Sequence, residues 1–392
     1  MKYNFYLRDT LQHIKYYKHN VEYDHIVEIG ESIDSIADYN HFKDYIIRNL
    51  KLRNLEKGIY LRKELFAEGL LYGHRKAFVR YAGNKNIDER FIFPYFEHGA
   101  DLREVINPEM FEPWIHSYVL QSDYKNKWIH NKKHLAPVYN IGPYILYAKP
   151  YYEENKLVTI REKYGRTLLL FPAHTFEGAS VEYNKRKFVS DVMGQFKSRF
   201  DTILVCVYWN DVDDPIYDIF QSEGAILVSA GFRGDEQFIS RLRTLIDLSD
   251  VVASNLIGSY IGYSQALNKP LYLFQDKAVL TSASHKLSRN NEKKYLNTIE
   301  TVFDAFSTLT PSKEQIDKQK QIVDRYWGRS SFFKTKDEAS RIVDMQIKLV
   351  RKSKGSIDRF EKEVKRVVEG RTDLELTNDQ IIILQDALGG QK

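Results

Sequence analysis

The sequence predicts an α/β fold, with a parallel β-sheet covered by helices in the second half of the chain. Three observations support this. Short apolar runs alternate with helical segments between residues 166 and 274, which is typical of βαβ units. Each run stops at Pro, Gly or a polar residue, as buried parallel strands do. A chain of 392 residues also has the length of two domains.

Composition narrows the functional class. Lys and Arg number 58 and Asp and Glu 53, which gives a net charge of +5. Nucleic-acid binders usually concentrate more positive charge, so we expect no nucleic-acid partner. The single cysteine, Cys206, excludes an intrachain disulfide and a multi-cysteine metal site. The chain has no signal-peptide pattern and no apolar run long enough to span a membrane. We expect a cytoplasmic protein and leave contact with the inner face of the cell membrane open.

Residues 1–150 are interpreted as a mixed α/β domain. A helix is expected over residues 41–67 and a strand over residues 76–81. An aromatic run over residues 91–96 leads into Glu97-His98-Gly99, and a further strand is expected over residues 114–120. The polar, Pro-containing segment 149–156 is interpreted as the interdomain linker.

Residues 151–310 form the second predicted domain, and residues 311–392 a helical C-terminal segment. The apolar runs of the second domain are each followed by a helical pattern or a polar turn. The expected strands cover residues 168–171, 202–209, 225–230, 250–253 and 271–274. A helix is expected over residues 357–368 of the C-terminal segment, where it would serve as a tail helix, an oligomer contact or a membrane-surface anchor.

Polar residues cluster in the loops that follow these strands. In an open parallel sheet, ligands bind beyond the carboxyl ends of the strands. The candidate ligand-binding residues in these loops are His174, Glu177, Arg233, Ser254, Asn255, Gly258, Ser259 and Tyr260.

The loop from Ser254 to Tyr260 is the strongest phosphate-binding candidate. Its hydroxyl and amide side chains precede a Gly-Ser step at the expected start of a helix, where free N–H groups favour an anion. Helix capping explains the same residue types equally well. Arg233 on a neighbouring loop favours the phosphate interpretation, although a surface salt bridge with Asp235 is its alternative role. The chain has neither a Walker-type phosphate loop nor a dinucleotide-binding glycine motif.

His174 and Glu177 lie in a glycine-containing loop and suit contacts to a ribose or a base. A buried hydrogen bond for His174 and a helix cap for Glu177 are equally compatible with the sequence. A His-x-x-Glu pair without a third ligand is a weak metal signal. Asp211-Val212-Asp213 is a weak Asp-x-Asp candidate that a capped turn explains better, so no metal site is assigned.

The end of the aromatic run supplies candidate bases in the first domain. Glu97, His98 and Asp101 each carry a group that accepts a proton from a hydroxyl. A capped turn and ordinary polar surface are the competing explanations. The basic stretch 125–134 is interpreted as a solvated helix face with a secondary role in contacting an anionic acceptor.

Several short motifs together resemble glycosyltransferases of the GT-B fold. Leu267-Asn268-Lys269-Pro270 precedes the last expected strand, as in many of these enzymes. Glu97-His98-Gly99, followed by the Gly-Pro turn of residues 138–143, resembles the first half of capsule and teichoic-acid transferases. Tyr326-Trp327-Gly328 resembles the tail of bacterial surface-polysaccharide transferases. Ser254-Asn255 stands where sialyltransferase-like relatives carry paired serines, which leaves the nucleotide open.

The resemblance implies two Rossmann-like domains facing a central cleft. The second domain would bind a nucleotide-activated sugar through the loop 254–260, with Arg233, His174 and Glu177 as further donor contacts. The first domain would bind a glycan or lipid-linked acceptor of capsule, lipopolysaccharide or teichoic-acid synthesis, with His98 or Glu97 as the base. No metal or other cofactor is implied. A CDP-glycerol-type polyol-phosphate transferase using His98 and His174, and a non-enzymatic nucleotide-binding protein, are the alternatives.

Overall fold

The chain divides into two compact units, each of which is discontinuous in sequence. The computed structural model describes residues 4–51, 61–83, 87–99, 101–103, 108–175, 179–282 and 289–389. Unit 1 comprises residues 1–24, 61–148 and 324–392, and unit 2 comprises residues 25–60 and 149–323. The ranges 1–150, 151–310 and 311–392 stay predictions of domain function. The units differ from these ranges because residues 25–60 group with the second half and the C-terminal helices with the first.

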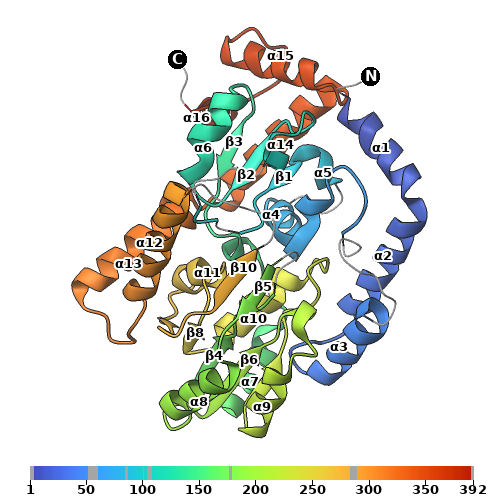
Figure 1. Ribbon diagram of the computed structural model, residues 1–392. Helices are drawn as coiled ribbons and strands as arrows, with labels where there is room; N and C mark the ends of the chain where they lie inside the picture. Colours follow the sequence, from blue (N-terminus) through green and yellow to red (C-terminus); the bar gives the residue numbers. More distant parts are fainter. Residues whose placement is uncertain are drawn as a thin grey trace. The chain divides into compact units, whose positions relative to one another are not determined.

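Unit 1 contains a small parallel sheet in the order β1-β2-β3. Tyr95 pairs with Tyr118, and Tyr118 with Val138. The strands are β1 (Tyr95–Phe96), β2 (Tyr118–Leu120) and β3 (Val138–Asn140). The helices wholly or mostly in this unit are α1 (Phe5–Lys15), α2 (Tyr17–Glu31), α4 (His74–Tyr81), α5 (Glu89–Ile92), α6 (Asn126–Lys132), α14 (Lys336–Ser353), α15 (Ile357–Val368) and α16 (Asn378–Ala387) (Figure 1).

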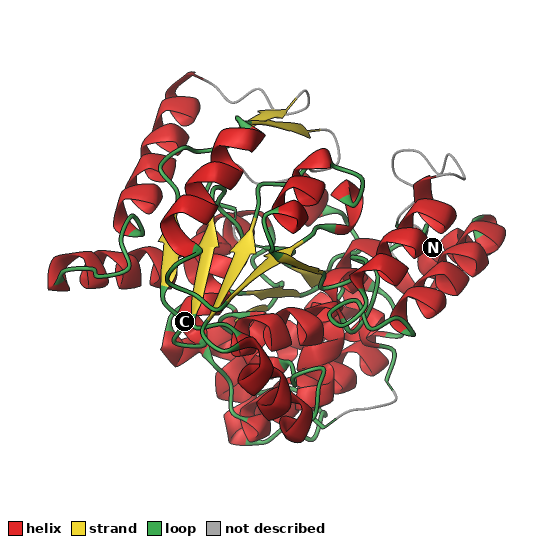
Figure 2. Cartoon of the chain, turned by 90° about the horizontal axis from the view of Figure 1, so that it is seen from below, coloured by secondary structure: helices red, strands yellow, loops and turns green. Residues whose placement is uncertain are grey.

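Unit 2 is built on a five-stranded parallel sheet in the order β7-β6-β4-β8-β9, and its strands run side by side in Figure 2. Leu168 of β4 pairs with both Ile203 of β6 and Val251 of β8. These strands are β4 (Thr167–Phe171), β6 (Thr202–Cys206), β7 (Ile226–Val228), β8 (Val251–Ser254) and β9 (Leu271–Leu273). The order places the topological switch between β4 and β8.

Helices connect and cover this sheet. α10 contacts β4 and α7, whereas α8 contacts α9, and right-handed crossovers place helices on both faces. A separate antiparallel ribbon pairs β5 (Ala179–Glu182) with β10 (Val279–Ser282). The helices are α3 (Tyr39–Ile46), α7 (Glu154–Tyr164), α8 (Lys185–Phe196), α9 (Pro215–Ser222), α10 (Phe238–Leu248), α11 (Tyr260–Ala266), α12 (Arg289–Ala305) and α13 (Lys313–Tyr326), whose last residues belong to unit 1.

Local sequence signals explain where many helices begin. Asp214 accepts a hydrogen bond from the Ile216 N–H at the start of α9, and Pro215 occupies the first helical position, where its missing N–H costs nothing. Thr335 and Glu338 form a reciprocal capping box at the start of α14, which satisfies otherwise unpaired backbone donors.

The central strands are fully buried: Leu168, Leu169 and Leu170 expose no surface.

The α/β class predicted from the sequence is confirmed, because the described chain contains sixteen α-helices and two parallel sheets. The strand expected over residues 76–81 is wrong. These residues belong to α4, whose buried positions His74, Arg75, Phe78 and Val79 follow helical spacing. The helix expected over residues 41–67 is also wrong in length. α3 ends at Ile46 and is followed by one π-helical turn, 47–51; residues 52–60 lie outside the described residues, and residues 61–66 contain no helix.

None of the helices in the described ranges combines the length and the apolar character that crossing a lipid bilayer requires.

Candidate functional site

The switch point of the unit 2 sheet is held together by buried side chains. Asn255 follows β8 directly, and its Oδ1 accepts a hydrogen bond from the Ala173 N–H in the loop after β4, at 2.8 Å. Ser254 Oγ donates to the Phe171 carbonyl oxygen at 2.7 Å. These contacts join the carboxyl ends of β4 and β8, where the sheet order places a ligand.

Asn255 has one polar atom left over. Its side chain is fully buried, and its Nδ2 has no hydrogen-bond partner within the described chain. A buried donor without an acceptor costs about 1–3 kcal/mol, so such atoms usually bind water or a ligand. The Nδ2 amide is therefore an unsatisfied donor at the switch point of the described chain.

Ser254 and Tyr260 serve a structural role in the described fold. The Tyr260 hydroxyl lies 2.7 Å from Ser254 Oγ and also donates to the Leu256 carbonyl oxygen. The Tyr260 ring stacks on Phe171, with centroids 4.7 Å apart and an interplanar angle of 4°. Burial raises the pKa of Tyr260 far above its ordinary value, so the hydroxyl stays protonated. These contacts fix the shape of the loop 255–259.

Gly258 and Ser259 complete this loop. A Cβ at position 258 would lie 2.4 Å from the Tyr260 ring, so the close packing of that ring requires glycine. Ser259 precedes α11 with helical backbone angles and makes no side-chain capping bond. The phosphate-binding role expected for these residues stays a prediction, and α11, with seven residues, offers only a short helix dipole.

A second set of contacts joins the loops after β4 and β6. Asp211 accepts hydrogen bonds from the Thr175 N–H, at 2.7 Å, and from the Thr175 hydroxyl. Asn210 Nδ2 donates to Thr175 Oγ1 at 2.9 Å. Asp211 therefore braces the loop after β4. These contacts give no support to Asp211-Val212-Asp213 as a metal-binding motif.

His174 lies in the same loop and stacks on Tyr208, with ring centroids 4.0 Å apart. Its Nδ1 lies 3.0 Å from the Thr175 carbonyl oxygen. Burial lowers the pKa of His174, against smaller raising effects of the Thr175 carbonyl and Asp211. The imidazole is therefore neutral at pH 7, which suits hydrogen bonding to a ligand better than charge pairing.

Arg233 joins this group through aromatic rings. Its guanidinium lies 5.4 Å from the centroid of the Trp209 ring, and the Tyr208 and Trp209 rings are 5.6 Å apart. The alternative role of Arg233, a salt bridge with Asp235, stays a prediction; both side chains are buried rather than on the surface, and Asp235 pairs with Arg241. His174 thus contacts the Tyr208 ring, and Arg233 contacts the neighbouring Trp209 ring. Glu177 lies outside the described residues.

In unit 1, Glu97 is held in a buried ion pair. It follows β1, and its Oε1 accepts from Lys125 Nζ at 2.9 Å while Oε2 accepts from the Gln121 N–H at 3.2 Å. Both side chains are buried. Both carboxylate oxygens of Glu97 are thus engaged within the fold. Lys125 is the first residue of the basic stretch 125–134. Because it is buried in this ion pair, it does not lie on the solvated helix face that we expected.

His98, in contrast to Glu97, is half-exposed and lies beside a carboxylate. Its Nε2 lies 3.4 Å from Glu68 Oε2, and both side chains are half-exposed. A carboxylate beside an imidazole orients the ring. Asp101, the third candidate base, is instead bound by Arg103 through two contacts of 2.8 and 2.9 Å.

His74 is a residue that the sequence reasoning missed. It is buried at the start of α4, its ring lies 4.6 Å from that of Tyr144, and it is hydrogen-bonded to the backbone of Glu97. Burial, followed by the charge of His98, lowers its pKa to about 3. The preceding residues, Tyr72 and Gly73, both have positive φ angles (61° and 68°). Backbone strain of this kind is concentrated at functional sites.

Glu68, Thr175 and Tyr208 were not predicted as site residues, because each acts through a partner distant in sequence. Lys125 was predicted only as part of the basic stretch 125–134. Only Gly73, beside a tyrosine and a histidine, offered a local signal of an unusual turn.

Comparisons with known proteins give no relative from which a function could be transferred: no protein family, curated protein or solved structure matches the chain.

Proposed function

We propose that the chain is a glycosyltransferase that moves a sugar from a nucleotide-activated donor to a hydroxyl of a bacterial surface glycan. Unit 2 would bind the donor and unit 1 would bind the acceptor, in a GT-B arrangement. The single observation that carries the proposal is the unpartnered, fully buried Asn255 Nδ2 at the switch point of a five-stranded parallel sheet. A phosphate oxygen of the donor is an acceptor that satisfies this amide.

The surrounding residues suit the rest of a nucleotide. Tyr208 and His174 present stacked rings beside the loop after β4, and a neutral imidazole hydrogen-bonds to a ribose or base. Arg233, held by the Trp209 ring, supplies positive charge for the diphosphate that leaves. The Thr175–Asp211 contacts brace the loop, so these groups are positioned before the donor binds.

His98 is the residue best suited to act as the base. It would take the proton from the acceptor hydroxyl while that oxygen forms a bond to the anomeric carbon. The bond between this carbon and the donor phosphate breaks, and the nucleotide leaves with the electron pair. Glu68 would orient the imidazole, whereas Glu97, bound to Lys125, would keep a structural role. A direct displacement of this kind inverts the anomeric configuration.

The Asn255→Asp variant tests the donor site most sharply. Aspartate retains the acceptor for the Ala173 N–H but replaces the Nδ2 donor by a negatively charged oxygen. Loss of a hydrogen bond to a charged group, about 1.5–3 kcal/mol, predicts that nucleotide affinity falls about 10- to 150-fold. Asn155→Asp makes the same change at an exposed position of α7 and should leave affinity unchanged.

The measurement is calorimetric binding of a panel of nucleotides and nucleotide sugars, together with donor hydrolysis. If the wild type releases nucleotide from a sugar donor and Arg233→Ala abolishes this release, the result would support the transferase. Turnover of CDP-glycerol alone would favour a polyol-phosphate transferase instead. Binding without turnover of any donor would indicate a nucleotide-binding protein. Equal affinities of Asn255→Asp and Asn155→Asp would refute the donor site.

A further inference from the structure

The helices α1 and α2 expose an apolar stripe on one face. Only Tyr16 separates the two helices, and hydrogen bonds from the Tyr16 N–H to the Gln12 carbonyl and from the Asn20 N–H to the Tyr16 carbonyl continue the helical path. The stripe consists of Leu7, Leu11, Ile14, Tyr17 and Val21, which are 37–65 % exposed. Their separations of four, three, three and four residues place them on one side of a helix.

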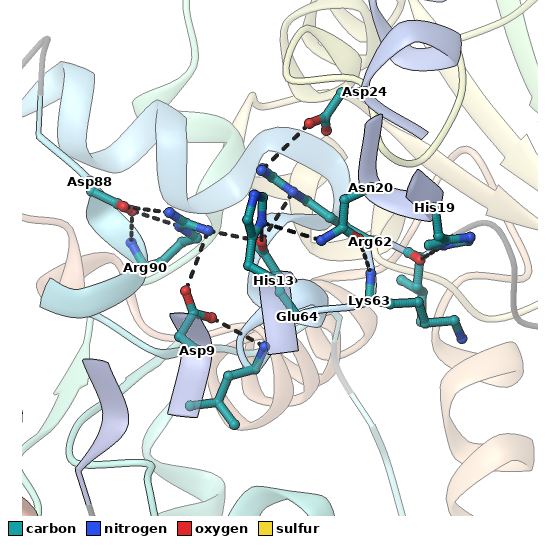
Figure 3. A network of polar contacts seen from close by, with 12 residues as sticks. Asp9, His13, His19, Asn20, Asp24, Arg62, Lys63, Glu64, Asp88 and Arg90 are labelled. Atoms are coloured by element: carbon teal, nitrogen blue, oxygen red, sulfur yellow. Dashed lines mark hydrogen bonds and ion pairs between the residues drawn. The ribbon is translucent and has the colours of Figure 1, made fainter. Parts of the chain in front are cut away.

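The opposite face of the same helices is anchored by polar side chains (Figure 3). Asp9 Oδ1 accepts from the Leu65 N–H at 3.2 Å, and Asn20 Oδ1 accepts from the Lys63 N–H at 2.8 Å. Both side chains are buried. The inner face is thus held to the segment that follows residue 60 by hydrogen bonds.

Ion pairs reinforce this anchoring. Glu64 Oε2 lies 2.9 Å from Arg90 Nη1, 3.1 Å from Arg62 Nε and 3.6 Å from His13 Nδ1. Arg62 also reaches Asp24 at 3.5 Å, so the network contacts the helices near both ends of the stripe (Figure 3).

This amphipathic pattern is the reverse of the usual one. A surface helix normally packs its apolar face inward and turns its polar face to solvent. Here a rigid polar network holds the inner face, although Phe5 and Tyr23 also contribute buried rings, and the outer face is the apolar one. An exposed apolar surface of this length indicates an external apolar partner.

The charges beside the stripe select the partner. Lys15 and Lys18 are exposed and lie next to the stripe between Leu11 and Val21, whereas Glu22 and Asp24 lie only at its far end. Lysine side chains extend from an apolar face to reach lipid headgroups, and each one near an anionic surface strengthens binding. A second copy of the chain, paired in parallel register, would instead place Lys18 against Lys18.

We propose that the face of α1 and α2 carrying Leu7, Leu11, Ile14, Tyr17 and Val21 binds the surface of an anionic lipid bilayer. The helices would lie in the plane of the interface, with the apolar stripe among the acyl chains and Lys15 and Lys18 at the headgroups. Lipid binding is separate from the proposed sugar transfer, because it needs neither donor nor acceptor.

Cosedimentation of the full chain with vesicles tests the proposal. We expect binding to phosphatidylcholine vesicles that contain about a quarter phosphatidylglycerol, and much weaker binding to phosphatidylcholine alone. Leu11→Glu combined with Ile14→Glu should weaken binding about a hundredfold. The matched control, Leu296→Glu with Ile316→Glu, changes two apolar residues of similar exposure on α12 and α13 and should bind as the wild type does.

A charge variant separates the two contributions. Lys15→Gln with Lys18→Gln should weaken binding about 10- to 30-fold at low salt, whereas Lys313→Gln with Lys320→Gln, both exposed on α13, should not. Circular dichroism would verify that each variant is folded. Vesicle binding that Leu11→Glu with Ile14→Glu leaves intact would overturn the proposal. So would a concentration-dependent dimer that this variant disrupts, without any vesicle binding. Neither assay includes a nucleotide donor. The vesicle-binding results can therefore be interpreted even if the proposed transferase activity is absent.

Discussion

Glu31 is expected to make the stability of unit 2 depend on pH. It ends α2, and its Oε1 accepts a hydrogen bond from the Glu236 N–H at 3.1 Å. Arg241 Nη2 donates to the Glu31 carbonyl oxygen at 3.0 Å and to that of Ile33 at 3.1 Å, while Nη1 pairs with Asp235. The Arg241 guanidinium therefore pairs with the Asp235 carboxylate and holds two backbone carbonyls, one of which belongs to Glu31.

Burial, followed by the charge of Asp235, raises the pKa of Glu31 to about 7. An unfolded glutamate titrates near 4.5. Between these pH values the folded chain retains a proton that the unfolded chain has lost, so the free energy of unfolding falls as the pH rises through this window. The full shift corresponds to about 3 kcal/mol. Because Glu31 is only partly buried, solvent screening reduces the expected effect to about 1–2 kcal/mol.

Glu31→Gln tests this reasoning, since glutamine keeps the hydrogen-bond acceptor and resembles the protonated carboxyl. Relative to the wild type, the variant should gain about 3–6 °C in melting temperature between pH 5 and pH 8. Thermal unfolding across this range is the measurement. Glu28→Gln, at an exposed position of α2, is the control and should follow the wild type. Parallel profiles for Glu31→Gln and the wild type would refute the coupling between Glu31 and Asp235.

Two further predictions concern histidines of unit 1. The ring of His116 lies between Phe5 and Phe360, at 4.7 and 4.5 Å, and burial lowers its pKa to about 3. Below pH 6.5 the unfolded chain takes up a proton that the folded chain excludes, so stability falls with acidification. His116→Phe should reduce that fall by about 2 kcal/mol between pH 6.5 and pH 5, as measured by urea unfolding, and an unchanged pH slope would contradict the assignment. His98→Ala should lower kcat about 10²- to 10⁴-fold without weakening donor binding. A collapse of donor affinity would show that His98 is not the base.

The sheet of unit 2 could be predicted from the sequence because its strands are buried on both faces. Such strands appear as uninterrupted apolar runs, and Leu168–Leu170 is fully buried in β4. The expected strand 202–209 ends earlier in the structure, at Cys206, because Trp209 begins a turn of 3₁₀ helix. Only the boundary was wrong there.

Unit 1 was harder to predict because its strands have two or three residues each, too few for a periodic pattern. The segments that form unit 2 were equally hard to predict. Residues 25–60 belong to it through contacts distant in sequence: Ser35 Oγ donates to the Ser229 carbonyl oxygen at 2.8 Å, and the Tyr152 hydroxyl donates to Asp34 at 2.6 Å. No local pattern encodes such pairs.

The candidate site shows why residue type alone does not separate a structural role from a ligand-binding one. Ser254 and Asn255 are neighbours, both are fully buried, and both types favour caps and phosphate loops alike. The Ser254 hydroxyl finds both a donor and an acceptor role within the fold, since it donates to the Phe171 carbonyl oxygen and accepts from the Leu256 N–H. Asn255 uses its oxygen and leaves its amide N–H groups without an acceptor in the described chain. The distinction depends on the loop after β4, 82 residues away in sequence, which supplies Ala173 to one end of the amide and nothing to the other. A ligand at the switch point would supply the missing acceptor. A substitution of Asn255, rather than of Ser254, is therefore the one expected to change donor binding separately from fold stability.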